Sequence, residues 1–290
     1  MAPLGELVSF ENKRGLRLDG ILYRADESAI SVVHVHGSYG NFYQNNFVRL
    51  FASRYVTEGL NFLSFNISGH DGIAEGYRGN DFEYVGGAVS PFSECVHDIA
   101  SAIDLVKRFS STVVLEGHSL GCDRILHFLL TTGARLNSIF LSPCDSYALH
   151  SRWIRPESVE QQIQRLKGSR AGEDLETLPS REYGVRQGGG EVYNIPITRR
   201  ALLSIIDGPP FKLMRIDTQA EFSLNSSAFA YIGGQDQLQT VGANTMFSHL
   251  EMRVRRLRRL YVADGDHDMK GCEDIVAKQI AAWIFEECRS

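Results

Sequence analysis

The chain has 290 residues, of which 43% are hydrophobic and 22% are charged, and its formal net charge is -5. This length fits one large α/β domain with an insertion, because single cores stop growing near about 250 to 300 residues. No run approaches the roughly 20 apolar residues of a membrane span, and no basic run marks a nucleic-acid surface. The first ten residues lack a basic start followed by an apolar run, so we expect a soluble, cytoplasmic protein that binds neither membrane nor nucleic acid.

The five cysteines are odd in number and scattered along the chain, with no Cys-x-x-Cys pair. This pattern argues against both a disulfide framework and a thiolate zinc site. We therefore expect reduced thiols and no metal.

The first half of the chain alternates between strand and helix patterns. Alternating apolar residues at 7–10 and 16–23 predict an antiparallel hairpin at a sheet edge. The elements expected after it, in chain order, are a strand at 30–35, a helix at 42–58, strand 60–65, helix 94–109, strand 112–115, helix 122–130 and strand 138–141. Strands that alternate with helices indicate a parallel sheet covered on both faces, which is the α/β class.

The alternation lapses between about Asp145 and Leu224, where charged helical stretches occur without a clear buried strand. We interpret residues 146–220 as a helical cap inserted into a core formed by residues 1–145 and 221–290. The core pattern resumes with a strand at 228–232, a helix at 241–252, a strand at 259–262 and a closing amphipathic helix at 274–285.

A candidate nucleophile stands where the strand at 112–115 meets the next helix, in Gly117-His118-Ser119-Leu120-Gly121. Strand, sharp turn and helix are the context that a Gly-x-Ser-x-Gly nucleophile elbow requires. The alternative is a chance pentapeptide on an ordinary turn. We expect Ser119 to be the nucleophile.

A serine nucleophile needs a base and an acid that orients the base, and in this type of fold they follow in the order Ser, acid, His. His267 is the histidine that lies after the last predicted strand, so it is the expected base. Asp236 follows the strand at 228–232 through a Gly-Gly-Gln turn and is the favoured acid. Asp145, at the end of the strand at 138–141, is the alternative acid.

The tetrahedral intermediate requires two backbone N–H donors. Leu120, the residue after the nucleophile, is expected to supply one. The other is expected from Ser38, or else from Tyr39, in the glycine-containing loop after the strand at 30–35.

Taken together, these motifs, in order and spanning most of the chain, resemble the serine hydrolases of the α/β-hydrolase superfamily, which include esterases and thioesterases, with a lid inserted after the sixth strand. The resemblance implies an eight-stranded, mostly parallel sheet flanked by helices. It also implies hydrolysis of an ester, thioester or amide without a cofactor.

Three functions remain open at this stage. The first is hydrolysis of a carboxylic ester or thioester of a small molecule through an acyl-enzyme on Ser119. The second is acyl transfer or cyclisation from the same acyl-enzyme, and the third is a non-catalytic ligand-binding module. The partner expected in each case is a small molecule, and the oligomeric state stays open, with a dimer among the alternatives.

The expected cap carries more Lys and Arg than Asp and Glu. The simplest interpretation is a solvated helix surface. The alternative is that an arginine turns inward and pairs with an acidic group on the substrate. The candidate substrate contacts are His118 next to the nucleophile and, in the cap, Arg152, Trp153, Arg155, Arg199 and Arg200.

Overall fold

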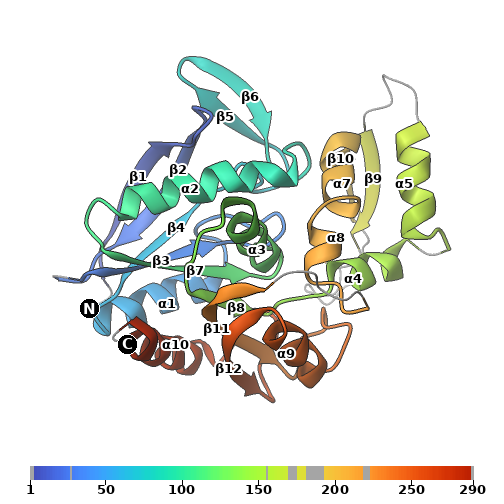
Figure 1. Cartoon of the computed structure of the whole chain (residues 1–290). Helices are drawn as coiled ribbons and strands as arrows, with labels where there is room; N and C mark the ends of the chain where they lie inside the picture. The colour runs from blue at the N-terminus through green and yellow to red at the C-terminus, as the bar shows by residue number, and fades with distance from the viewer. Residues whose placement is uncertain are drawn as a thin grey trace.

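The structure is a computed structural model of the chain (Figure 1). It describes residues 3–26, 28–154, 156–168, 175–180, 193–217 and 223–288.

An eight-stranded sheet forms the centre of the molecule. Its strands lie in the order β1 (Gly5–Glu11), β2 (Arg17–Tyr23), β4 (Asn61–Phe65), β3 (Ile30–Val35), β7 (Thr112–His118), β8 (Ser138–Leu141), β11 (Leu224–Gly233) and β12 (Val254–Val262). The pairs β1–β2 and β2–β4 are antiparallel, and every later pair is parallel. The expected hairpin and the mostly parallel sheet are therefore confirmed.

Helices cover both faces of this sheet, as Figure 1 shows. They are α1 (Asn46–Thr57), α2 (Cys95–Val106), α3 (Leu120–Thr132), α9 (Ala243–Glu251) and α10 (Glu273–Cys288). Side chains on a strand alternate between the faces, so Val32 and Val114 join the hydrophobic cluster under α1 and α10. Val33 and Leu115 instead join the cluster under α2, α3 and α9. Burial on both faces explains why these strands read as continuous apolar runs.

Several elements begin or end away from their expected positions. The helix expected at 42–58 begins only at Asn46, because the Asn41 side chain accepts hydrogen bonds from the backbone N–H groups of Tyr43 and Gln44. Such a local turn competes with helix formation. β12 begins at Val254, earlier than expected. The sequence did not reveal this start, because β12 is an edge strand whose exposed arginines interrupt the apolar pattern.

A second hairpin was not predicted from the sequence. It pairs β5 (Ala74–Arg78) with β6 (Asp81–Val85) across Gly79 and Asn80. Gly79 has φ = 57°, as a tight hairpin turn requires. Each strand has a single buried residue, Gly76 in β5 and Val85 in β6, so both lack the apolar alternation by which the buried strands were found.

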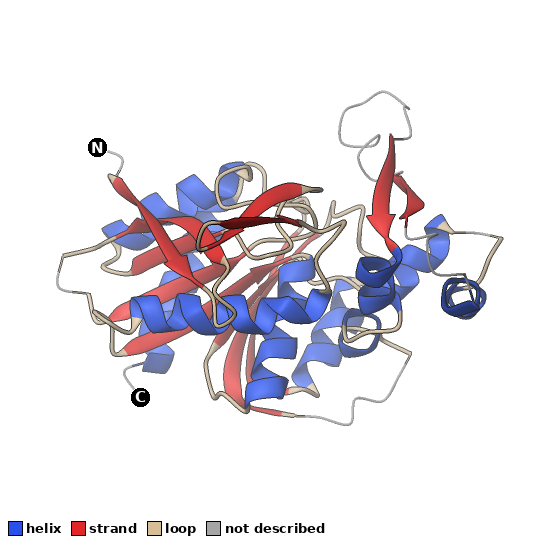
Figure 2. Ribbon diagram, turned by 90° about the horizontal axis from the view of Figure 1, so that it is seen from above, coloured by secondary structure: helices blue, strands red, loops and turns tan. Residues whose placement is uncertain are grey.

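The insertion follows β8, the sixth strand of the main sheet in chain order. It contains α4 (Ser146–Trp153), α5 (Val159–Gly168), β9 (Leu175–Ser180), β10 (Tyr193–Thr198), α7 (Arg199–Ile206) and α8 (Pro210–Leu213). In Figure 2 it lies to one side of the layers formed by the sheet and its helices. The antiparallel pair of β9 and β10 departs from the purely helical cap that the sequence predicted.

A third hydrophobic cluster holds the insertion together. It contains Val159, Ile197, Leu202 and Phe211 from the insertion and Ala88 from the core. The backbone N–H of Thr198 also donates to the carbonyl oxygen of Ala88. The insertion therefore packs around its own small core and is tied to the loop that precedes α2.

All five cysteines are free thiols, four of them buried. Among the helices that the structure describes, none combines the length and apolarity needed to cross a bilayer.

Candidate active site

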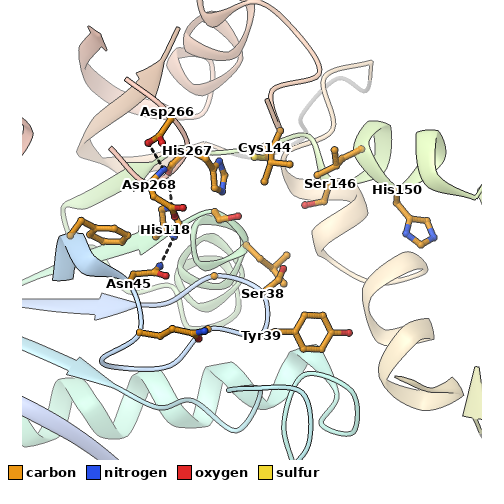
Figure 3. Close-up of a pocket in the computed structure, with 18 of the residues that line it drawn as sticks. Ser38, Tyr39, Asn45, His118, Cys144, Ser146, His150, Asp266, His267 and Asp268 are labelled. Carbon is orange, nitrogen blue, oxygen red and sulfur yellow. Dashed lines mark hydrogen bonds and ion pairs between the residues drawn. The ribbon is translucent and has the colours of Figure 1, made fainter. Parts of the chain in front are cut away.

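A cavity of about 520 Å³ opens where the parallel strands end, between the sheet and the insertion (Figure 3). Because β3 and β7 pair in parallel, with Val35 opposite Gly117, the loops that follow these two strands lie side by side. The ends of β8, β11 and β12 continue the same edge. This edge is where open α/β sheets bind their ligands.

Ser119 occupies a strained turn between β7 and α3. Its φ of 55° and ψ of -125° lie in a region that non-glycine residues rarely adopt. The backbone N–H of Ser119 donates to the carbonyl oxygen of Leu141 on β8 at 2.9 Å, which fixes the turn against the next strand. A Cβ atom at position 121 would collide with the carbonyl oxygen of Val35, so the elbow requires glycine there.

His267 and Asp236 form a buried pair beside this turn. Nδ1 of His267 lies 2.9 Å from Oδ2 of Asp236. Asp236 also accepts hydrogen bonds from the backbone N–H of Leu238 at 2.9 Å and from the Gln239 side chain at 3.3 Å. With the carboxylate accepting, Nδ1 carries the proton and Nε2 is left as the acceptor.

Nε2 of His267 is buried and bonds to none of the described residues. The side chains of His267 and Ser119 line the same cavity. The hydrogen bond between them is therefore not made in this structure, and hydrogen bonds of this kind often tighten only with substrate in place.

The turn that ends in Asp236 (residues 233–236) and the loop that carries His267 (residues 263–268, called the histidine loop) contact each other through their backbones. A Cβ atom on Gly233 would collide with the carbonyl oxygen of Gly265. The backbone N–H of Gln235 donates to that same carbonyl at 2.8 Å. The Gly-Gly-Gln-Asp sequence thus permits the close contact that brings Asp236 to His267.

Asp145, the alternative acid, has a different set of partners. Its Oδ1 accepts from the backbone N–H of Ala148 at 2.9 Å, which caps the N-terminus of α4. Its Oδ2 accepts from the backbone N–H of Ile216 at 3.0 Å. Asp145 therefore ties the two ends of the insertion to the end of β8, and His267 bonds to Asp236 instead.

The loop after β3 and the first turn of α3 bring the expected oxyanion donors close to Ser119. Ser38, Tyr39 and Leu120 all line the cavity with Ser119. A Cβ atom on Gly37 would lie 3.0 Å from Cβ of Ser119, so the loop backbone runs directly against the elbow. Tyr39 has φ = 50°, which turns the backbone sharply at this point.

No protein-family model and no curated protein matches the chain. Several solved structures do. Est1E from Butyrivibrio proteoclasticus with ferulic acid bound is 12% identical, with a TM-score of 0.65 over 98% of this chain and 100% of that one. The Pyrococcus furiosus esterase Pf2001 is 12% identical, with a TM-score of 0.62 over 99% and 92%. The mouse alpha/beta hydrolase domain-containing protein 10 is 15% identical, with a TM-score of 0.65 over 97% and 99%.

The chain has the α/β-hydrolase fold. The mostly parallel eight-stranded sheet and its flanking helices match these neighbours. At such low identity, the likeness establishes the fold of the chain and leaves its chemistry to the geometry of the site.

Arg124 was not identified from the sequence, although it supports the loop that carries Ser38 and Tyr39. It lies on α3, is 4% exposed, and its Nη1 donates to the carbonyl oxygens of His36 at 2.7 Å and Gly37 at 3.0 Å. Burial lowers the pKa of Arg124 to about 10, so the guanidinium stays charged at neutral pH. Its position gave no motif signal, because a single arginine next to Asp123 on a helix matches no known pattern.

His118 lies in the cavity wall, as expected, and it also holds the histidine loop. Its Nε2 donates to the carbonyl oxygen of His267 at 2.9 Å, and its ring centroid lies 4.9 Å from that of His267. The hydroxyl of Ser142 donates to the same carbonyl at 2.8 Å. Burial, and then the neighbouring His267, lower the pKa of His118 to about 3, so its imidazole is neutral at neutral pH.

Of the expected cap contacts, the structure does not bring Arg152, Arg199 or Arg200 to the cavity. Arg152 is exposed and donates to the carbonyl oxygen of Thr240, and Arg200 is exposed. Arg199 is half-buried, and none of these three side chains is among those that line the cavity. Arg155 lies outside the described residues, and so does the side chain of Trp153.

Within the described residues, one group has the spacing of metal ligands. Atoms of Cys144, Asp236 and His267 lie within 4.8 Å of one another. Two of the three residues already form the acid–base pair, so the group coincides with the candidate active site.

Proposed function

We propose that the protein is a serine hydrolase that cleaves a carboxylic ester or thioester of a small molecule through an acyl-enzyme on Ser119. The observation that carries this proposal is the pairing of His267 with Asp236 at 2.9 Å, which leaves Nε2 unbonded in the cavity that Ser119 lines. The esterases among the structures of the same fold are consistent with it.

In the first step, Oγ of Ser119 attacks the carbonyl carbon of the substrate while Nε2 of His267 takes the hydroxyl proton. The negative charge of Asp236 stabilises the imidazolium that forms and holds the ring in one orientation. The oxyanion accepts hydrogen bonds from the backbone N–H of Leu120 and from that of Ser38 or Tyr39. Donors of this kind each contribute about 3 to 4 kcal/mol to transition-state stability.

The tetrahedral intermediate then collapses, and His267 gives its proton to the leaving oxygen or sulfur. A water molecule enters, His267 takes its proton, and attack on the acyl carbon releases the acid and restores Ser119. The rim of the cavity includes the exposed residues Gln44, Asn46 and Lys270, so water can reach the site. This access favours hydrolysis over acyl transfer or cyclisation, which need water to be excluded.

A ligand-binding module without catalysis would have no need for a strained serine or for an oriented histidine. Both features are present here, at Ser119 and His267. Strain of this kind persists only where the surrounding structure enforces it.

The proposal is tested with a fluorophosphonate probe, which reacts with activated serines. We expect stoichiometric labelling of the protein and no labelling of Ser119→Ala. With a p-nitrophenyl ester, Ser119→Ala and His267→Ala should each lower kcat by several orders of magnitude, and the double variant should be scarcely worse because the residues act as a unit. Labelling that persists in Ser119→Ala would contradict the assignment.

A further inference from the structure

The cavity has two chemically distinct sides. One side is formed by the insertion and is mostly apolar, with Leu149, Leu202, Ile205, Ile206 and Phe211 in its wall beside the polar Ser146 and His150. The other side is formed by the histidine loop and the start of α1, and it carries polar and charged residues. Figure 3 shows Asp266, Asp268 and Asn45 on the side of His267, and Ser146 and His150 of α4 on the opposite side.

The chemistry decides which part of a substrate lies on which side. His267 must deliver its proton to the leaving group, so the leaving group lies next to the histidine loop. The acyl group extends from the carbonyl carbon in the other direction, toward the insertion. There Leu202 is 1% exposed and Phe211 is 3% exposed, so these residues belong to a packed apolar wall.

Acidic residues dominate the leaving-group side. Among the described residues that line the cavity, the carboxylates are Asp266, Asp268 and Glu273, and Lys270 is the single lysine, with no arginine beside it. His118 does not offset these charges, because burial keeps it neutral. Glu273 and Asp274 in the first turn of α10 also oppose the partial positive charge of that helix end.

From these two sides we infer the substrate class: an ester with an apolar acyl group and a neutral or cationic leaving group. The inference rests on the proposed function and makes it more specific. Phosphorylated leaving groups, such as the coenzyme A part of a thioester, would meet the acidic side and are disfavoured. This runs opposite to the acidic substrate that the basic charge of the insertion suggested, because none of the described arginines of the insertion lines the cavity.

The expected size of the preference follows from Coulomb's law. One unit charge at about 7 Å in near-aqueous surroundings changes a rate constant roughly threefold. Such interactions between partly exposed groups weaken as salt is added. The preference should therefore be modest per charge and dependent on ionic strength.

The experiment compares three oxygen esters of hexanoic acid that differ in the charge of the leaving group. They are hexanoylcholine, 3,3-dimethylbutyl hexanoate, which has the same shape without the charge, and the anionic 3-sulfopropyl hexanoate. We expect kcat/KM to fall in that order, by about threefold to tenfold at each step in low salt, and the differences to shrink in about 0.5 M NaCl. Hexanoyl esters should also exceed acetyl esters.

Two variants show whether residues on this side of the cavity cause the preference for a cationic leaving group. Glu273→Gln should lower the ratio of choline ester to sulfopropyl ester about threefold, and Lys270→Gln should raise it by a similar factor. Glu286→Gln is the matched control, because Glu286 pairs with Arg258 near the far end of the same helix, about 20 Å away along its axis. This control should leave the ratio unchanged.

The outcomes separate the two proposals. Hydrolysis that depends on Ser119, with equal rates for the three esters or with the anionic ester preferred, would overturn the substrate class and leave the serine hydrolase intact. Absence of both hydrolysis and Ser119 labelling would overturn the proposed function itself. A ratio that responds equally to Glu273→Gln and Glu286→Gln would show that the preference comes from net charge and not from this side of the cavity.

Discussion

The end of the sheet and the insertion contribute to the same cavity in different ways. At the end of the sheet, strand pairing and backbone contact place each group, as where Gly121 lies against the carbonyl oxygen of Val35. In the insertion, the lining side chains belong to a separate small hydrophobic cluster that includes Leu202, Ile206 and Phe211. The proposed reacting groups therefore lie where strands pair and backbones touch, and the proposed acyl-binding wall lies on a segment whose side chains can be exchanged more freely.

This difference has a physical reason. Catalysis demands positions accurate to well below 1 Å, which loops over a rigid sheet can provide. An apolar wall needs only the right volume and polarity, and several sequences satisfy that requirement. The two aspartates at strand ends, Asp236 and Asp145, show the contrast directly, because one orients His267 and the other anchors the insertion.

Replacing Asp236 and Asp145 by asparagine, one at a time, should produce the largest difference in kcat between two variants. Asp236→Asn is expected to lower kcat by roughly 10⁴, because the amide can favour the wrong tautomer of His267. Asp145→Asn should keep kcat within about tenfold and should lower Tm instead, since it weakens the contacts to Ala148 and Ile216. Both are measured with a p-nitrophenyl ester and by thermal unfolding. A larger loss of kcat in Asp145→Asn would make Asp145 the catalytic acid.

Removing the hydrogen bond from His118 to the His267 carbonyl should have an intermediate effect. His118→Phe is expected to lower kcat about 10- to 100-fold with little change in KM, because small displacements of a catalytic group are costly. His118→Gln retains a donor and should recover part of the loss. Since the pKa of His118 is already about 3, the acid limb of the pH profile should be the same in His118→Gln and in the unmodified protein.

Ser142→Ala is the matched comparison for this prediction, because it removes the other donor to the same carbonyl. The double variant should be worse than either single variant. If His118→Phe lowers Tm but leaves kcat unchanged, His118 serves only to pack the core.

The smallest effect is expected where the two regions meet, at Asp123 on α3. Its carboxyl is 1% exposed, with one oxygen unbonded among the described residues and the other 3.4 Å from the Ser146 hydroxyl of α4. Burial, and then the neighbouring Asp145, raise the pKa of Asp123 well above its usual value. Above about pH 4 the unfolded chain therefore binds fewer protons than the folded one, and this group lowers stability as the pH rises.

Asp123→Asn removes that titration. The free energy of unfolding of the variant, relative to the unmodified protein, should rise by about 1 kcal/mol or more between pH 4.5 and 7.5, since each unit of pKa shift corresponds to about 1.4 kcal/mol. Urea unfolding at the two pH values measures it. The exposed Asp104, changed to Asn, is the control and should show no such trend. A difference that does not vary with pH would contradict the prediction.

Local patterns in the sequence predicted much of the fold and the residues of the site. The buried strands produce apolar runs, and the turn at Ser119 requires the glycines that stand two residues to either side of it in the chain. The order of motifs indicated which histidine and aspartate to choose, and the structure places these two at 2.9 Å. The exposed hairpin of β5 and β6 escaped prediction because its strands bury too little to leave an apolar pattern.

The sequence by itself determined the alternation of strands and helices, the glycine-flanked Ser119 and the candidates for its partners, because each depends on residues close together in the chain. The tertiary structure decided which of Asp236 and Asp145 contacts His267, how Arg124 holds the loop after β3, and which side of the cavity is mostly apolar or acidic. These properties depend on contacts between segments far apart in sequence. A side chain's charge is visible in the sequence, but the direction in which it points is set only when the elements pack.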